Sequence, residues 1–207
     1  MKTLIIYGHL DKNSLGAALA DAYKNKIAEQ SNVKTLHLTD LQFELDLGGN
    51  YKSRTEQMLE PDIIKAQELI RWADHLVFAY PIWWGLMPAL LKGFLDRVFL
   101  PDYAFKYVEG KALPEKLLKG KTARLLVTAD SPNFWYSLVM GRPSHIAMRR
   151  SILGFCGISP IKIKTFGNVR SSSPELRKRW LQQAAALAHR DTRSLKQPDQ
   201  KLLAEQS

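Results

Sequence analysis

Short apolar runs alternate with amphipathic stretches along most of the chain. The run at 3–7 is continuously apolar, which is typical of a central strand covered on both faces, whereas 33–38 alternates and predicts a less buried strand. Further strands are expected at 75–80, where Pro81 ends the run, at 122–128 and at 161–166. Apolar residues at a helical spacing predict helices over 14–27, 60–73, 87–99, 148–155 and 173–189, and the polar stretch 40–61 predicts a long surface excursion.

Strands that alternate with helices favour parallel pairing with right-handed crossovers. Five strands in this arrangement predict an α/β fold with a doubly wound parallel sheet of order 2-1-3-4-5 and helices on both faces. We expect one domain over 1–190 and a polar C-terminal tail over 191–207, because the composition turns polar after His189. This order places a ligand crevice at the carboxyl ends of the first and third strands, so the loops after Tyr7, Tyr80 and Thr128 should carry the chemistry.

Composition narrows the class of protein. No apolar run approaches the roughly 20 residues that cross a bilayer, and the single cysteine, Cys156, excludes an intrachain disulfide, which suits a reducing cytoplasm. The net charge of +10 comes mainly from Lys and Arg in the second half, spread over several elements. This distribution favours a solvated basic surface or attraction of a phosphorylated ligand, and no nucleic-acid motif is present. The five histidines show no ligand spacing, so no metal site is expected.

The first loop, 8–14, joins the central strand to a helix N-terminus. Free backbone N–H groups and the helix dipole favour an anion there, and His9 and Ser14 add donors that suit a phosphate. Ser14 would also serve as a plain helix cap, so this loop alone is a weak signal.

The second loop, 80–88, carries adjacent tryptophans where a strand end meets the expected crevice. Core packing is the alternative explanation, but two neighbouring side chains in a loop bounded by Pro and Gly cannot both point inward, so at least one should line a cavity. An isoalloxazine ring needs such a flat wall together with backbone N–H groups. The third loop, after Thr128, could close the other side of the ring. Its Tyr136 is either an ordinary loop aromatic or a hydrogen-bond donor to a reduced flavin or an acceptor carbonyl.

With these residues in place, the chain resembles the flavin-dependent NAD(P)H:quinone oxidoreductase family, which includes the ancillary oxidoreductases of bacterial potassium-efflux systems. The similarity covers about 3–185 and is strongest over 61–67, 73–78 and 80–99. It implies a flavodoxin-like fold, a cytoplasmic homodimer, and FAD as the cofactor with FMN as the alternative.

The resemblance also implies roles for individual residues. His9 and Ser14 would bind the flavin phosphates with Leu15 and Gly16 beside them, Gln67 would reach the cofactor, and Pro81, Ile82, Trp83, Trp84 and Gly85 would hold the ring. Aromatic residues that shape the acceptor pocket across the homodimer interface would be Tyr103, Phe105 and Tyr107.

Two departures from the family pattern fall on the acceptor side. We expect Thr128, Ala129, Asp130 and Ser131 to bind the cofactor as well, but relatives usually carry Thr-Thr-Gly-Gly at these positions, so the backbone approach to the ring changes. Tyr136 matches the active-site tyrosine, but Arg142 occupies the position of the usual histidine and His145 is only nearby. We therefore assign Tyr136 as the catalytic residue, with Arg142 and His145 as substrate-binding residues.

The resulting hypothesis is an NAD(P)H dehydrogenase of the quinone type: hydride passes from NAD(P)H to the flavin and then to a quinone or similar electrophilic acceptor. A flavodoxin-like electron carrier is one alternative, although such carriers are usually acidic. A regulatory flavoprotein subunit that docks on a potassium-efflux transporter is the other.

Overall fold

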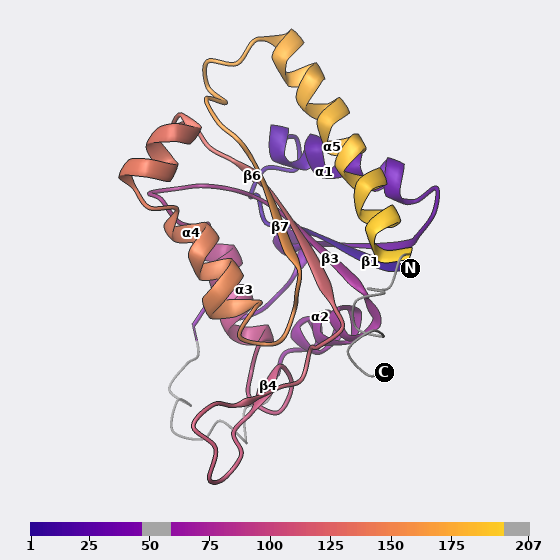
Figure 1. The fold of residues 1–207 in the computed structure, drawn as a ribbon, viewed down its shortest axis with the longest axis vertical. Helices are drawn as coiled ribbons and strands as arrows, with labels where there is room; N and C mark the ends of the chain where they lie inside the picture. The colour runs from indigo at the N-terminus through magenta and orange to yellow at the C-terminus, as the bar shows by residue number, and fades with distance from the viewer. Residues whose placement is uncertain (47–58, 197–207) are drawn as a thin grey trace, which may run out of the picture.

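The computed structural model describes residues 1–46 and 59–196 and contains one five-stranded parallel sheet (Figure 1). The strands are β1 (Lys2–Tyr7), β2 (Asn32–His37), β3 (His75–Pro81), β6 (Thr122–Thr128) and β7 (Ile161–Phe166). Their order is β2-β1-β3-β6-β7, and every adjacent pair is parallel. The fold class and strand order expected from the sequence are therefore confirmed.

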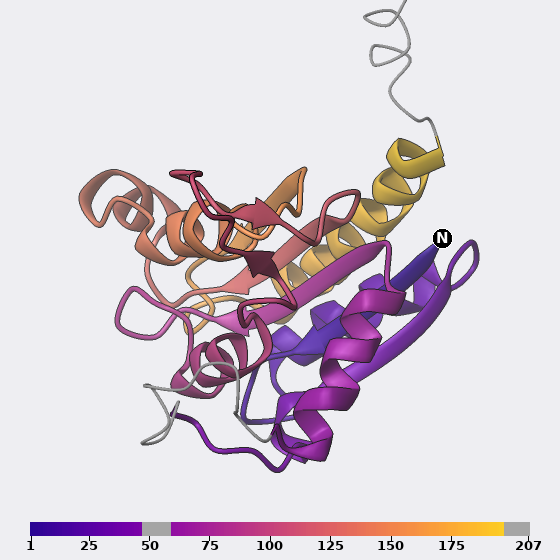
Figure 2. The same ribbon diagram turned by 90° about the horizontal axis from the view of Figure 1, so that it is seen from below.

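Helices cover both faces of this sheet, as Figures 1 and 2 show. Helices α1 (Leu15–Ile27) and α5 (Pro174–Lys196) pack together over one face, against inward residues such as Ile5. The other face carries α2 (Pro61–Trp72), α3 (Ala89–Val98) and the segment that contains α4 (Pro143–Ile146), against residues such as Leu4 and Phe78. Alternate residues of β1 thus enter two different cores, which is why its sequence is continuously apolar. No described helix is long and apolar enough to cross a membrane.

The irregular elements depart most from the expected pattern. The helix expected at 148–155 is instead a π-helix, Ala147–Ile152, that continues directly from α4, and a second π-helix spans Trp135–Val139. In both, an N–H donates to the carbonyl five residues earlier, as in a π-helix: Leu153 donates to Met148, and Met140 donates to Trp135. The residue pattern also did not predict the antiparallel pair β4 (Phe105–Lys106) and β5 (Glu115–Lys116), or the 3-10 turn Leu38–Asp40.

Helix α5 continues past the position where fraying was expected. It runs to Lys196, and Asp191, the first residue of the expected tail, is 2% exposed. The Asp191 carboxylate accepts hydrogen bonds from Arg124 Nε and Nη2 at 2.8 and 2.7 Å and from the Tyr23 hydroxyl at 2.9 Å. The start of the tail is therefore part of the packed domain, and residues 197–207 lie outside the described part of the chain.

His75 extends this buried network. Burial lowers the pKa of His75 from 6.5 to about 4, against an opposing effect of Asp191, so the imidazole is neutral near pH 7. The Tyr23 hydroxyl donates to Asp191, so its oxygen accepts from His75 Nε2 at 3.0 Å. Nδ1 of the neutral ring then accepts from the Thr122 hydroxyl at 2.7 Å.

This shift predicts a loss of stability in mild acid. Between pH 6.5 and 4 the unfolded chain takes up a proton on His75 that the native state does not, so the free energy of unfolding falls as the pH falls, by up to roughly 3 kcal/mol. Urea unfolding at a series of pH values measures this, with His75→Gln as the control that removes the titrating group. If the pH dependence of the parent protein equals that of the variant, the expectation is wrong.

Candidate flavin site

A cleft of about 340 Å³ opens at the carboxyl ends of β1, β3 and β6. Every one of the three loops selected from the sequence contributes to it. Its lining consists of His9, Asp11, Ser14, Leu15, Pro81, Ile82, Trp83, Thr128, Ala129, Asp130, Val169 and Arg177. The cleft thus brings together nine of the fourteen residues expected to bind the cofactor and leaves Gly16, Gln67, Trp84, Gly85 and Ser131 off its wall.

The start of α1 supplies donors for an anion. Ser14 caps the helix, and its Oγ accepts from the Ala17 N–H at 3.2 Å, while helix geometry leaves the Leu15 and Gly16 N–H groups without an intrahelical acceptor. His9 Nδ1 accepts from the Asp11 N–H at 2.8 Å, so a neutral His9 carries its proton on Nε2, available to donate. The chemistry of this end of the cleft suits a phosphate.

The tryptophan loop is a two-residue turn. Trp83 and Leu86 exchange backbone N–H···O bonds of 2.9 Å, and both central residues have positive φ, 50° at Trp84 and 80° at Gly85, as in a type I′ turn. This conformation sends Trp84 fully into solvent, whereas Trp83 lines the cleft with its ring edge-on to His9 at 5.9 Å between centroids. The expectation that at least one tryptophan lines a cavity is met by Trp83.

In the third loop, Asp130, one of the departures from the family pattern, makes a structural hydrogen bond. Asp130 Oδ1 accepts from the Arg170 N–H at 3.1 Å, and the Ser131 carbonyl accepts from the Asn168 N–H at 3.3 Å. These bonds tie the loop after β6 to the loop after β7. Asp130 therefore orders the cleft wall as well as lining it.

Sequence reasoning missed three residues of the cleft wall, Asp11, Val169 and Arg177, and Arg177 is the cation among them. It lies in the first turn of α5, and its guanidinium donates to Ser172 Oγ at 2.8 Å and to the Val169 carbonyl at 3.2 Å. No local pattern marks it, because it reaches the cleft only through the packing of α5 on α1.

Tyr136 does not line the cleft at the ends of β1, β3 and β6. Its side chain is 1% exposed, and its hydroxyl donates to the Gly85 carbonyl at 3.2 Å and accepts from the Ser144 N–H at 3.1 Å. Burial raises the pKa of Tyr136, which keeps the hydroxyl protonated. In this arrangement Tyr136 holds the turn that carries Trp83, and a catalytic role for it stays a prediction.

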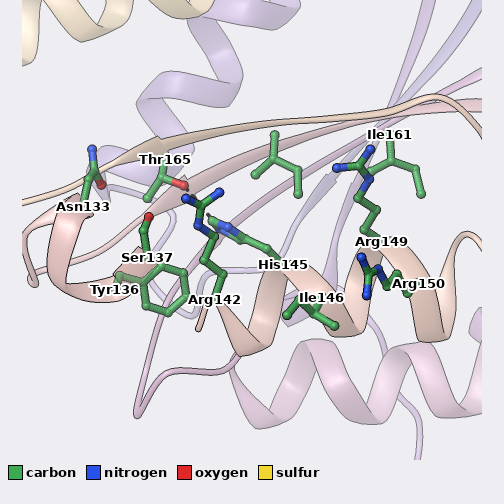
Figure 3. A pocket seen from close by; sticks show the side chains of 11 residues that line it. Asn133, Tyr136, Ser137, Arg142, His145, Ile146, Arg149, Arg150, Ile161 and Thr165 are labelled. Atoms are coloured by element: carbon green, nitrogen blue, oxygen red, sulfur yellow. Dashed lines mark hydrogen bonds between the residues drawn. The ribbon is translucent and has the colours of Figure 1, made fainter. Parts of the chain in front are cut away.

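Tyr136, Arg142 and His145 come together in a second cavity of about 540 Å³ (Figure 3). The His145 ring meets Tyr136 edge-on at 5.0 Å, and its Nε2 lies 3.2 Å from Thr165 Oγ1. Burial, followed by the charge of Arg142, lowers the pKa of His145 to about 4. His145 is therefore neutral near pH 7 and does not act there as a cationic proton donor.

The aromatic residues expected to shape the acceptor pocket lie at the amino ends of the strands, opposite the cleft. Leu118, between this segment and β6, donates its N–H to the Cys156 carbonyl in the turn before β7. The Phe105 ring packs on Phe155 at 4.9 Å, and the Tyr103 hydroxyl donates to the Gln67 carbonyl at 2.7 Å. Within one chain, these aromatics and Gln67 do not meet the flavin cleft; a contribution across a homodimer interface remains a prediction. Among the residues that the structure describes, no group of His, Cys, Asp or Glu could hold a metal ion.

The family comparison agrees with this architecture. The model of the flavodoxin-like fold family matches residues 1–190, and the chain belongs to this family. A protein of Haemophilus influenzae named an uncharacterized NAD(P)H oxidoreductase is 27% identical over 89% of this chain and 93% of its own length. A ribosyldihydronicotinamide dehydrogenase-like protein of Penicillium crustosum is 31% identical over 66% of this chain, which spans 60% of that relative.

A solved structure extends the likeness to three dimensions. Smu.1420 of Streptococcus mutans UA159 superimposes with a TM-score of 0.81 at 33% identity, over 91% of this chain and 98% of that one. The family match and the relatives that are named NAD(P)H oxidoreductase or quinone dehydrogenase confirm the predicted resemblance to the NAD(P)H:quinone oxidoreductases and the oxidoreductase class that it implied.

Proposed function

We propose that this protein is a flavin-dependent oxidoreductase that takes hydride from NAD(P)H and passes it to a quinone or similar electrophilic acceptor. The observation that carries the proposal is the cleft, which combines a phosphate-binding helix start with a flat aromatic wall. When bound, the flavin accepts hydride from the donor and gives it to the acceptor. The names of the relatives support a reduced nicotinamide as the donor.

The chain's own residues bind and orient the cofactor. His9 Nε2 and the first N–H groups of α1 hold a flavin phosphate, with Arg177 as the nearby cation. Trp83 and Ile82 form one wall for the ring, and Thr128, Ala129 and Asp130 form the other. Tyr136 acts through its hydrogen bond to Gly85, which fixes the tryptophan turn.

The acceptor pocket is proposed to need a second copy of the chain. Apolar side chains crowd the surface beside the cleft, and Trp84 and Leu138 are 101% and 80% exposed. The turn at Gly85 and Met140 belong to one patch, because a Cβ on Gly85 would lie 2.8 Å from Met140 Cε. Such a patch is typical of an interface between chains. A homodimer would cover it and could bring Tyr103, Phe105 and Tyr107 of one copy to the cleft of the other.

The purified full-length protein tests the proposal directly. We expect a bound flavin that NADH or NADPH bleaches without oxygen and that a quinone reoxidises, with the mass of the acid-extracted cofactor deciding between FAD and FMN. Sedimentation of the same sample gives the oligomeric state. A colourless protein that gains no affinity for added FAD or FMN would overturn the proposal.

The alternatives predict different behaviour of the same sample. An electron carrier would bind flavin but fail to oxidise NAD(P)H catalytically. A regulatory subunit would bind a membrane transporter with negligible turnover of any quinone. No described contact favours either over the oxidoreductase.

A further inference from the structure

The second cavity is a basic hollow that the proposed function has not used. We call it the arginine hollow; it lies between the helical segment 133–150 and the edge strand β7. Figure 3 shows Arg142 and Arg149 extending from the helical segment toward β7, with Arg150 beside Arg149. Its volume of about 540 Å³ falls in the range of small-molecule sites, roughly 300–1,000 Å³.

Positive charge in the arginine hollow is not balanced by the protein. Its lining contains Arg142, Arg149 and Arg150 but no Asp or Glu, and within 1–46 and 59–193 none of these guanidinium groups forms an ion pair. A smaller hollow of about 310 Å³ shares Arg149 and adds two lysines, so the basic surface continues along β7. Three guanidinium groups around one concavity are suited to phosphate oxygens.

The rest of the lining indicates the shape of the anion. Asn133, Ser137 and Thr165 supply hydrogen-bonding groups, whereas Ile146, Ile161 and Ile163 supply apolar surface. A ligand that satisfies both carries phosphates together with sugar or ring surfaces. Inorganic phosphate alone would leave the isoleucines without a partner.

The arginine hollow lies beside the flavin cleft. One continuous loop after β6 serves both: Asp130 lines the cleft, and Asn133 lines the hollow. Tyr136 lines the hollow and bonds to the turn that carries Trp83 of the cleft. A donor whose reactive ring enters the cleft can therefore extend its other end over this loop.

Resting on the proposed function, we propose that the arginine hollow binds the phosphates of the nicotinamide dinucleotide, so that the dinucleotide and not the phosphate-free dihydronicotinamide riboside is the preferred donor. The helix start of α1 and Arg177 serve the flavin phosphate, and the arginines of the hollow serve the donor. Neutral His145 adds a hydrogen-bonding ring without a further charge.

The test compares two donors on a double variant, Arg149→Ala with Arg150→Ala. Rapid anaerobic mixing measures flavin reduction by NADPH and by dihydronicotinamide riboside. We expect the variant to need at least about tenfold more NADPH for half-maximal reduction, with the riboside unaffected. A matched double variant on the exposed face of α5, Lys178→Ala with Arg179→Ala, removes the same charge and should behave as the parent protein.

Calorimetric titration with ADP-ribose gives a second readout that does not depend on turnover. The flavin-loaded parent should bind this fragment, and the Arg149/Arg150 double variant should lose most of that affinity. Equal losses with both donors, or unchanged NADPH and ADP-ribose binding, would overturn the inference. Flavin content, read from the absorption spectrum, separates the two proposals. A protein that takes up no flavin contradicts the proposed function, whereas titration of that flavin-free protein with ADP-ribose still tests the arginine hollow.

Discussion

Replacing Asp191 by alanine is expected to lower the free energy of unfolding by about 3–5 kcal/mol. Arg124, on the interior strand β6, is only 5% exposed and directs Nε and Nη2 at this carboxylate. Removing the carboxylate leaves a buried guanidinium without its counter-charge, and the Tyr23 hydroxyl also loses its acceptor. Urea unfolding of the full chain at neutral pH measures the change.

Two further variants make this prediction specific. Asp96→Ala removes a carboxylate from an exposed pair with Lys92, and it should change stability by less than about 1 kcal/mol. A chain that ends at Arg190 should lose at least as much stability as Asp191→Ala, because it lacks the same carboxylate. If Asp191→Ala matches Asp96→Ala, Arg124 does not depend on Asp191 in the folded state.

Asp191 also illustrates which part of the fold could not be predicted from the sequence. The bounds of the strands were predicted to within about a residue, for example 3–7 against Lys2–Tyr7, because buried parallel strands have short apolar runs as their sequences. The end of α5 was missed because its apolar pattern stops at Ala188, whereas Asp191 is held by Arg124, 67 positions away. A polar residue buried by a distant partner has no local signature.

The residues of the candidate site also fall into a group that could be predicted from the sequence and a group that could not. The loops at His9, Trp83 and Thr128 were found because strand order alone fixes where a doubly wound sheet opens. Arg177 and Arg149 were not found, since only helix packing brings them to a cavity. The direction of the Tyr136 hydroxyl depends on the turn at Gly85 and on the π-helix that carries it, and neither is visible in residue spacing.

Substituting Ser14 by aspartate is expected to weaken flavin binding by about a hundredfold or more while leaving the protein at least as stable. Aspartate is as good a helix cap as serine, and its charge interacts favourably with the start of α1, so the bond to the Ala17 N–H is retained. The same carboxylate lies where the flavin phosphate would bind, and repulsion of two anions costs several kcal/mol. The two effects therefore have opposite signs in one variant.

Thermal unfolding of the flavin-free protein and titration with FMN and FAD measure the two effects separately. Ser14→Asn is the matched control: it caps α1 without a charge, so its flavin affinity should stay within about tenfold of the parent. His9→Ala, which removes one hydrogen-bond donor, should lower flavin affinity by about tenfold. If Ser14→Asp binds flavin as tightly as Ser14→Asn, the phosphate does not bind at the start of α1, and the ring walls formed by Trp83 and Thr128 to Asp130 would have to hold the cofactor without it.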